Sequence, residues 1–344
     1  MKAGRRTVLR AMARHGSAAL VLGRGGLWKT LAGTPLGVST ASAFAASCAT
    51  PLLGGCQAPG LAQGLVWQLD NAHIDPAGRW DALGVTDLMV QWSAVDGIAF
   101  VPLPDPAESA AFSPAPRLPE WRRIADMPWA QRILMGLAGM SSEPHARAAI
   151  PTLVAQSRQL AEAIRRQRSD NGTMPLDIEG WYFPVEVDPT WAQAPQLREA
   201  LANLPRPLWI SVYDRSNIGG AALARWLASW LADDIGVLFQ DGVGVYARTA
   251  PVARSYVDAL VGRFGAQRVR VIAEAFRPLP PVRGDTPASA AAAETAAASA
   301  PAPLFRAATA DELRPQLLAY QGYRVYLFDG PHYVSNQLVE RLLQ

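Results

Sequence analysis

The sequence predicts an α/β fold, a (β/α)8 barrel that forms a single domain after an N-terminal export signal. Eight strand-like runs alternate with helix-like runs through the body of the chain. Such alternation implies parallel strands joined by helical crossovers. Most of the strand-like runs are apolar on both faces, as buried parallel strands are. Eight units in about 280 residues fit a barrel of ordinary size.

The strand-like runs are short, apolar and separated by longer segments. We expect strands at 64–70, 87–93, 132–138, 180–187, 207–213, 235–241, 269–275 and 323–329. Apolar residues recur with helical periodicity between these runs. This periodicity predicts helices near 145–167, 191–203, 219–232, 251–264, 309–320 and 333–343.

Two stretches interrupt the alternation. Residues 102–120 are rich in proline and follow the second strand. Residues 278–303 begin with Pro-Leu-Pro-Pro and continue as an Ala/Ser-rich tract. Because such a composition buries little apolar surface, we expect a mobile or disordered low-complexity loop there. The loop follows the seventh strand directly, which places it on the face where the strands end.

Residues 1–55 have the features of an export signal, so we assign the barrel to 56–344. The run Gly4-Arg-Arg-Thr-Val-Leu-Arg10 resembles a twin-arginine signal. Leu53-Gly-Gly-Cys56 resembles the lipobox of bacterial lipoproteins, in which Cys56 is acylated. Ala43-Phe-Ala45 is a competing cleavage site that would give a soluble product, and an Arg-rich leader without a targeting role is a third alternative. We expect a location on the periplasmic side of the envelope, with a lipid anchor.

Charge and composition limit the classes of partner that the protein could bind. The formal net charge is +3, but 1–55 holds seven Lys or Arg residues and no acid, so the remainder carries −4. A mildly acidic body without a basic run argues against nucleic-acid binding. No stretch reaches about 18 uninterrupted apolar residues, so we expect membrane contact through the lipid anchor only. The 11 Trp residues slightly favour a polysaccharide or oligosaccharide partner, since indole faces stack on sugar rings.

Cysteine and histidine usage argues against a disulfide or a metal site. The only cysteines, Cys48 and Cys56, precede the predicted barrel. His73, His145 and His332 are the only histidines of the barrel segment. They are far apart in the sequence and lack the spacing of metal ligands, so we expect no bound metal.

One glycine motif imitates a cofactor site. Gly242-Val-Gly-Val-Tyr-Ala247 follows a predicted strand and matches the G-x-G-x-x-A dinucleotide fingerprint. In a true fingerprint the helix begins within the glycines. Here Thr249 and Pro251 place the helix start several residues later. The chain also lacks a Walker loop and a G-x-S-x-G elbow, so we expect no cofactor.

Two glutamates are the main catalytic candidates. Glu186 ends the fourth predicted strand and Glu274 ends the seventh. Strand ends converge on one face of a (β/α)8 barrel, where catalysis takes place. Two carboxyl groups over that face are the minimum for glycosidic bond cleavage. The aromatic and aliphatic neighbours of Glu186 should raise its pKa and suit it to act as an acid, although each glutamate could instead form a structural ion pair with an arginine.

Other polar and aromatic residues lie at the predicted strand ends and could bind a sugar. The substrate-binding candidates are Trp67, Gln68, Asp70, Gln91, Trp92, Tyr182, Asp241 and Asp329. An indole surface beside amide and carboxylate groups is what a sugar subsite requires. Core packing is the alternative for each Trp, and loop capping is the alternative for the two later aspartates.

Four segments, in sequence order, carry a resemblance. They are Val90-Gln-Trp92, Gly180-Trp-Tyr-Phe-Pro-Val-Glu-Val-Asp188, Phe239-Gln-Asp-Gly-Val-Gly244 and Ala273-Glu-Ala-Phe276. Together they resemble a bacterial TIM-barrel domain family of unassigned function, similar to glycoside hydrolases, over roughly residues 62–335. The glutamates also resemble those of the large retaining glycosidase clan, which implies that Glu186 is the acid/base and Glu274 the nucleophile. The chain departs from that clan at Val185, where an Asn is usual.

Two functions remain open. The first is hydrolysis of glycosidic bonds in a bacterial polysaccharide or envelope glycan. The second is glycan binding without catalysis, by a lipoprotein that acts in polysaccharide assembly or export. A carboxyl separation of about 5–5.5 Å indicates retention of configuration and about 6.5–9.5 Å indicates inversion. A glutamate buried in an arginine pair would favour binding alone.

Overall fold

The computed structural model describes residues 60–103, 111–169, 173–279 and 304–344. The predicted export signal with its lipobox cysteine Cys56 and most of the predicted low-complexity loop lie outside the described residues. None of the helices in the described part of the chain is both long and apolar enough to cross a bilayer.

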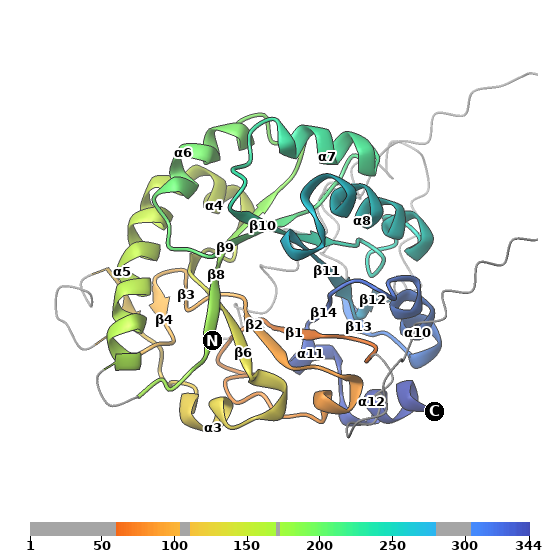
Figure 1. Ribbon diagram of the computed structural model, residues 1–344. Coiled ribbons are helices and arrows are strands. Elements are labelled where there is room, and N and C mark those ends of the chain that lie inside the picture. Colours follow the sequence, from red (N-terminus) through yellow and green to blue (C-terminus); the bar gives the residue numbers. More distant parts are fainter. Residues whose placement is uncertain (1–59, 104–110, 170–172, 280–303) are drawn as a thin grey trace, which may run out of the picture. The chain divides into compact units, whose positions relative to one another are not determined.

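The central element is a closed barrel of parallel strands, which confirms the predicted fold class (Figure 1). Its strands are β1 (Gly64–Trp67), β2 (Asp87–Val90), β6 (Arg132–Gly136), β8 (Ile178–Val187), β9 (Leu208–Val212), β10 (Ile235–Gln240), β11 (Val269–Glu274) and β14 (Val325–Phe328). They follow the order β1-β14-β11-β10-β9-β8-β6-β2 around the barrel. Each of these strands lies within or overlaps one predicted run, because a continuous apolar run is typical of a strand buried on both faces.

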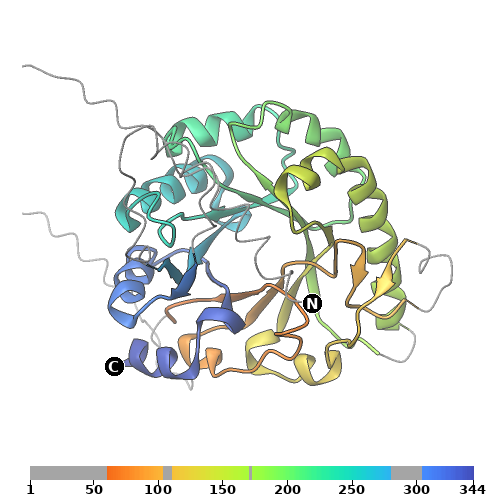
Figure 2. The same cartoon turned by 180° about the vertical axis from the view of Figure 1, so that it is seen from behind.

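Helices surround the strands, as Figures 1 and 2 show from opposite sides. The helices are α3 (Trp121–Ala125), α4 (Glu143–Ala148), α5 (Ile150–Ser169), α6 (Leu197–Ala202), α7 (Gly220–Ala228), α8 (Ala250–Phe264), α10 (Ala310–Ala319), α11 (Gly330–Tyr333) and α12 (Asn336–Leu343). Short 3-10 turns lie at Trp80–Leu83, Pro128–Ala130, Ala194–Gln196 and Ala266–Arg268. The helix predicted near 145–167 is divided into α4 and α5, and the one near 333–343 into α11 and α12.

Two small sheets lie beside the barrel strands. A four-stranded sheet has the order β5-β4-β3-β7, formed by Ser113–Pro114, Ile98–Ala99, Ala94–Val95 and Ala138–Gly139. β12 (Phe276–Pro278) pairs with β13 (Phe305–Ala307) in an antiparallel ribbon, in which Arg277 lies opposite Arg306. This ribbon flanks the low-complexity tract on both sides and brings its two ends together.

The barrel interior is a packed core that draws residues from every strand. Its buried members are Val66, Met89, Leu134, Tyr182, Trp209, Leu238, Ile272, Phe276, Tyr326 and Phe328. A larger apolar cluster includes most of the opposite-facing strand residues, such as Leu65 and Trp67, and buried helix residues such as Leu260. Since side chains alternate along a strand, residues two positions beyond an interior residue also point inward.

The N-terminal half of the interior contains a buried cation. Arg270, only 1% exposed, lies two residues before Ile272 and donates to Tyr326 Oη at 2.7 Å and to Glu179 Oε1 at 3.1 Å. Its guanidinium lies 3.9 Å from the centre of the Trp209 ring. Tyr326, Glu179 and Trp209 therefore hold the guanidinium inside this half of the barrel.

Candidate functional site

The C-terminal end of the barrel interior is polar. Four polar residues lie two positions after an interior residue of the same strand, so their side chains also point into the barrel, nearer its C-terminal end. They are Gln91, Ser211, Gln240 and Glu274. Four of the eight strands, including the adjacent β9, β10 and β11, thus end in inward-facing amide, hydroxyl or carboxyl groups above an apolar layer.

Glu186 reaches the same end through an irregularity in β8. Phe183 pairs with Ile210 of β9, but the next pair is Glu186 with Ser211, so β8 carries two extra residues at this point. The irregular segment lifts Glu186 above Tyr182, whose hydroxyl donates to Ser211 Oγ at 2.8 Å. A strand irregularity of this kind re-aims side chains and is common beside active sites.

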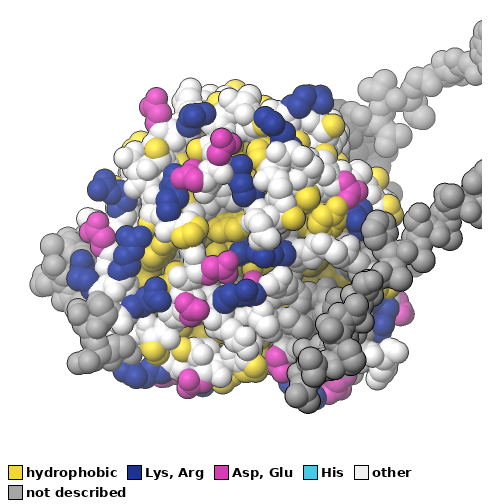
Figure 3. Space-filling view, in the orientation of Figure 1, with side chains coloured by type: hydrophobic (Ala, Val, Ile, Leu, Met, Phe, Trp, Pro, Cys, Tyr) yellow, Lys and Arg dark blue, Asp and Glu magenta, His cyan; other side chains and the backbone are white. Residues whose placement is uncertain are grey.

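Two adjoining hollows open above this polar layer. The first hollow, of about 460 Å³ with its open solvent, is lined by Gln91, Trp92, Met140, Ser141, Glu143, Tyr182, Pro184, Glu186, Ser211 and Gln240. The second hollow, of about 220 Å³, is lined by Glu186, Tyr213, Arg215, Gln240, Val245 and Glu274. The two catalytic candidates therefore border the same space. In the surface view of Figure 3, acidic and basic side chains lie side by side around hydrophobic ones near the middle of the face shown.

Glu186 is buried and paired with an arginine. Its side chain is 9% exposed, and Arg215 Nη2 donates to its Oε1 at 2.8 Å. Burial raises the pKa of Glu186, while the charge of Arg215 acts in the opposite direction. Asp188 Oδ2 accepts from the Arg215 backbone N–H at 2.8 Å and so fixes the loop that carries the arginine.

A third carboxyl group, which the sequence analysis missed, lies in the first hollow. Glu143 begins α4, and Arg147 Nε donates to its Oε1 at 3.0 Å. Burial, together with the nearby charge of Glu186, raises the pKa of Glu143 to about 7. Arg147 also donates to the backbone carbonyl of Glu186 at 3.2 Å. The sequence gives little signal for Glu143, since it lies on a helix and not at a barrel-strand end.

Glu274 has no arginine partner among the ion pairs of the described residues. It is 3% exposed, and its Oε2 accepts from the Val245 backbone N–H at 3.2 Å. The Gly244 backbone lies so close that a Cβ there would be 2.8 Å from this oxygen. The glycines of the 242–247 motif therefore allow a loop to pack on Glu274. Burial and the charge of Asp241 raise the pKa of Glu274 to about 8.

Asp241 supports Glu274 from behind and lines neither hollow. It is fully buried and accepts from the Val243 and Glu274 backbone N–H groups at 3.1 and 3.3 Å. Gln316 and Tyr320 donate to its other oxygen at 2.5 and 2.9 Å. Burial raises the pKa of Asp241, but these four hydrogen bonds favour its ionised form. These hydrogen bonds oppose the effect of burial on Asp241, and the proximity of Asp241 disfavours a second negative charge on Glu274.

The remaining predicted binding residues lie in three places: beside the first hollow, in the core, and around the end of β1. Gln91, Trp92 and Tyr182 border the first hollow together with Glu186. Trp67 is fully buried and packs on Trp121 with ring centroids 5.8 Å apart, which matches the core alternative.

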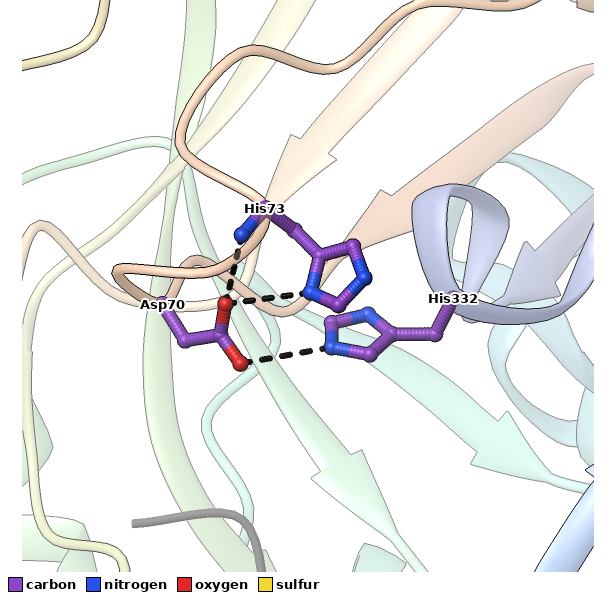
Figure 4. Close-up of side chains that lie close together, drawn as sticks. All are labelled: Asp70, His73 and His332. Atoms are coloured by element: carbon purple, nitrogen blue, oxygen red, sulfur yellow. Dashed lines mark hydrogen bonds and ion pairs between the residues drawn. The ribbon is translucent and has the colours of Figure 1, made fainter. Parts of the chain in front are cut away.

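Three other predicted residues lie around the end of β1, where they line neither hollow. Asp329 is fully buried and accepts from the Gln68 backbone N–H at 3.1 Å. Asp70 contacts His73 and His332 (Figure 4).

The histidine cluster was not foreseen from the sequence. His73 Nδ1 lies 3.1 Å from Asp70 Oδ1, and His332 Nε2 lies 3.4 Å from Asp70 Oδ2. The two imidazole rings lie 3.7 Å apart between centroids. Burial lowers the pKa of His332, but Asp329 and Asp70 outweigh this effect and raise it to about 9. One ligand atom from each of Asp70, His73 and His332 lies within 4.8 Å of the others, so the group could hold a metal ion.

Comparisons with known proteins add the following. No protein-family model matches the chain, and no curated protein matches its sequence. A candidate α-L-fucosidase from Bacteroides thetaiotaomicron is similar in structure, with 14% identity over 85% of this chain and 96% of the other, and a TM-score of 0.48. A chitinase from Chromobacterium violaceum is similar with 13% identity over 82% of this chain and 99% of the other, and a TM-score of 0.38. Neither similarity is high enough to indicate a function for this chain.

Proposed function

We propose that the protein hydrolyses glycosidic bonds in a bacterial polysaccharide or envelope glycan, with Glu186 and Glu274 as its catalytic carboxyl groups. One observation carries the proposal: two buried glutamates at the C-terminal ends of β8 and β11 border one hollow. Glycoside hydrolysis requires one carboxyl group that holds a proton and one that is ionised.

Burial raises the pKa of both glutamates, but the charges next to them differ. Glu274, with a pKa of about 8, is protonated at neutral pH. Arg215 favours the ionised form of Glu186 through a hydrogen bond of 2.8 Å. We therefore assign the acid to Glu274 and the ionised partner to Glu186, the reverse of what the resemblance to the retaining clan implies. Two carboxyl groups whose environments separate their pKa values are the usual basis of such assignments.

The first hollow supplies suitable contacts for a sugar. Trp92 and Tyr182 give aromatic surface, and Gln91 and Gln240 give amide groups for hydroxyls. Ligand pockets commonly combine apolar walls with a few polar groups. A sugar in the first hollow would present its bond near Glu186, which the two hollows share.

Glycan binding without cleavage is the second candidate, and the Glu186–Arg215 ion pair favours it. A carboxylate held by a guanidinium is a weaker nucleophile, yet both groups can still hydrogen-bond sugar hydroxyls. In this case the protein would act as a glycan-binding lipoprotein in polysaccharide assembly or export.

Export and anchoring form part of the proposal and rest on the sequence. The twin-arginine-like run and the lipobox support delivery to the periplasmic side of the envelope, with a lipid anchor at Cys56.

A screen of the purified protein on a panel of bacterial exopolysaccharides tests the function. If the protein is a hydrolase, we expect the wild type to release reducing ends and the Glu186→Gln and Glu274→Gln variants to release none. The exposed change Glu340→Gln is the matched control, since among the described residues Glu340 forms an exposed pair with Arg79, far along the chain from both candidates. If the protein binds glycans in affinity electrophoresis but releases no reducing ends from any polymer, it binds glycans without cleaving them, and the hydrolase proposal is wrong.

A further inference from the structure

We propose that Asp70, His73 and His332 form a binding site for a divalent transition-metal ion, and that Zn²⁺ is the ion that fits it best. The site is separate from both hollows, which these residues do not line. It lies where β1 and β14 end, and these strands are neighbours in the barrel. The proposal does not depend on the glycosidase assignment.

The donor atoms are spaced as ligands of one ion are. In tetrahedral coordination at about 2.0–2.1 Å, two ligand atoms lie about 3.3 Å apart. His73 Nδ1 lies 3.1 Å from Asp70 Oδ1 and His332 Nε2 lies 3.4 Å from Asp70 Oδ2, so each imidazole is near a different oxygen of the carboxylate. All three chosen atoms lie within 4.8 Å of one another, so small rotations of the side chains bring them to this spacing.

A second observation, independent of the donor spacing, comes from the other nitrogen of His332. His332 Nδ1 lies 2.6 Å from Asp329 Oδ2, and Asp329 is fully buried. The Gln68 backbone N–H donates to the same aspartate oxygen at 3.1 Å, which fixes its position. Metal-binding histidines usually donate their second ring nitrogen to such a carboxylate, which orients the ring and keeps the first nitrogen available. Asp329 thus lies beside Nδ1 of His332, and Nε2 is the ring nitrogen near Asp70.

The other two ligands are also held in place before any ion binds. Asp70 Oδ1 accepts from the backbone N–H groups of Ala72 and His73 at 2.8 and 2.7 Å. Trp67 Nε1 donates to the His73 carbonyl at 2.8 Å, so the buried indole anchors the loop after β1. Figure 4 shows the Asp70 carboxylate with both imidazoles on one side of it, one from this loop and one from α11.

The donor set and exposure decide the kind of ion. Two imidazoles and one carboxylate suit Zn²⁺ and related transition metals, whereas Ca²⁺ and Mg²⁺ prefer oxygen ligands. The side chains of Asp70, His73 and His332 are 32%, 22% and 16% exposed, so an ion can enter from solvent. Three protein ligands leave a position for water or for an oxygen of a bound molecule.

Zinc binding by the purified full chain tests the site. The protein is stripped with a chelator, dialysed, and titrated with ZnCl₂ by calorimetry, with metal content measured by mass spectrometry. We expect one zinc site that is lost, with affinity reduced at least about 100-fold, in His73→Ala, His332→Ala and Asp70→Asn. Asp329→Asn should weaken binding by about 10–100-fold, as the loss of an outer partner does.

His145→Ala is the matched control, because His145 is an exposed histidine outside the cluster. It should bind zinc as the wild type does. Far-UV circular dichroism of each variant in the presence of chelator verifies the fold independently of the metal. Visible absorption of the Co²⁺-loaded wild type should report low-coordinate geometry with nitrogen ligands. Wild-type protein that binds no zinc, or His332→Ala and His73→Ala variants that bind it normally, would overturn the proposal and leave the cluster as a hydrogen-bonded bridge between β1 and α11.

Discussion

Arg215 Nη2 donates to Glu186 Oε1 at 2.8 Å, inside a hollow that Glu186 shares with Glu274. The pair is largely buried, with the two side chains 15% and 9% exposed. Water therefore screens the guanidinium weakly, and its influence on the Glu186 carboxyl is strong. The charge of Asp241 raises the pKa of Glu274, whereas the charge of Arg215 lowers that of Glu186.

The first prediction concerns this arginine. Arg215→Met removes the charge that opposes the effect of burial, so the pKa of Glu186 should rise above its wild-type value. A carbon-detected NMR titration of the Glu186 carboxyl measures the change without a substrate. Arg79→Met is the control, since Arg79 forms an exposed pair with Glu340, and such pairs contribute little. An unchanged or lower pKa in the Arg215 variant would contradict the electrostatic assignment.

The second prediction is a pH dependence of stability caused by Glu274. Its pKa is raised from 4.5 to about 8 in the folded protein. The folded state therefore favours the protonated carboxyl. The stability that this group contributes is fully present below about pH 4.5 and is lost as the pH rises through 8. The loss is on the order of a few kcal/mol, since one pKa unit corresponds to about 1.4 kcal/mol.

Glu274→Gln isolates this contribution, because the amide resembles the protonated acid and does not titrate. We expect the melting temperature of the variant to exceed that of the wild type by more at pH 9 than at pH 5. His332 also loses stabilising charge as the pH rises, but it does so in both proteins, so the difference reports Glu274 together with its interaction with Asp241. A difference that is constant between the two pH values would show that Glu274 is ionised in the folded protein.

The fold was predictable because apolar runs and helical periodicity act locally. Alternation along each strand could also have predicted which side chains point into the barrel and which point outward. Trp67 and Asp241 occupy the outward-facing register of their strands, next to the inward-facing Val66 and Gln240, and alternation alone would have excluded them from the hollows. Glu274 ends a regular strand, so its position followed from the sequence.

The remaining features depend on contacts between distant segments. The two extra residues that lift Glu186 arise where β8 pairs with β9, and Pro184 is the local signal for such an irregularity, because proline cannot donate to the strand ladder. His73 and His332 meet only because β1 and β14 close the barrel. Arg215 lies shortly after β9, and this position beyond a strand end was the one sequence feature that could have identified it as a site residue. Glu143 had no such signal.

The third prediction concerns the Ala/Ser-rich tract. Deletion of 284–302 should lower the melting temperature by less than about 5 °C, since the tract has no large apolar side chain and loop closure depends weakly on length. The flanking strands β12 and β13 already pair, and the Leu279 N–H donates to the Leu304 carbonyl at 2.7 Å, so a short connection can join them. Replacing the tract with Gly/Ser of equal length is the control. A larger decrease on deletion, absent from this control, would show that loop length matters more than expected.

The fourth prediction concerns the lipid anchor. Cys56→Ala should move the protein from the membrane fraction to the soluble periplasmic fraction, because each buried CH₂ of an acyl chain contributes about 0.8 kcal/mol to membrane binding. Cell fractionation and immunoblotting measure the change. Cys48→Ala is the matched control, since it lies outside the lipobox. Unchanged membrane association of the Cys56 variant would show that the lipobox is not used.

The last prediction assigns the two catalytic roles. If Glu274 is the acid, Glu274→Gln should slow the cleavage of natural glycosides strongly but retain much of the first-step rate on an activated aryl glycoside, whose leaving group needs no proton. Glu186→Gln should abolish cleavage of both substrates while binding persists, since an amide can neither attack the anomeric carbon nor stabilise positive charge there.

Rates on the two substrates, measured for each variant beside Glu340→Gln, separate the possibilities. The opposite pattern would assign the acid to Glu186 and the nucleophile to Glu274, as the resemblance to the retaining clan implies. Full activity in both variants would make the pair structural. Because Arg215 stabilises the ionised form of Glu186 and Asp241 opposes ionisation of Glu274, we expect the activated substrate to rescue only the Glu274 variant.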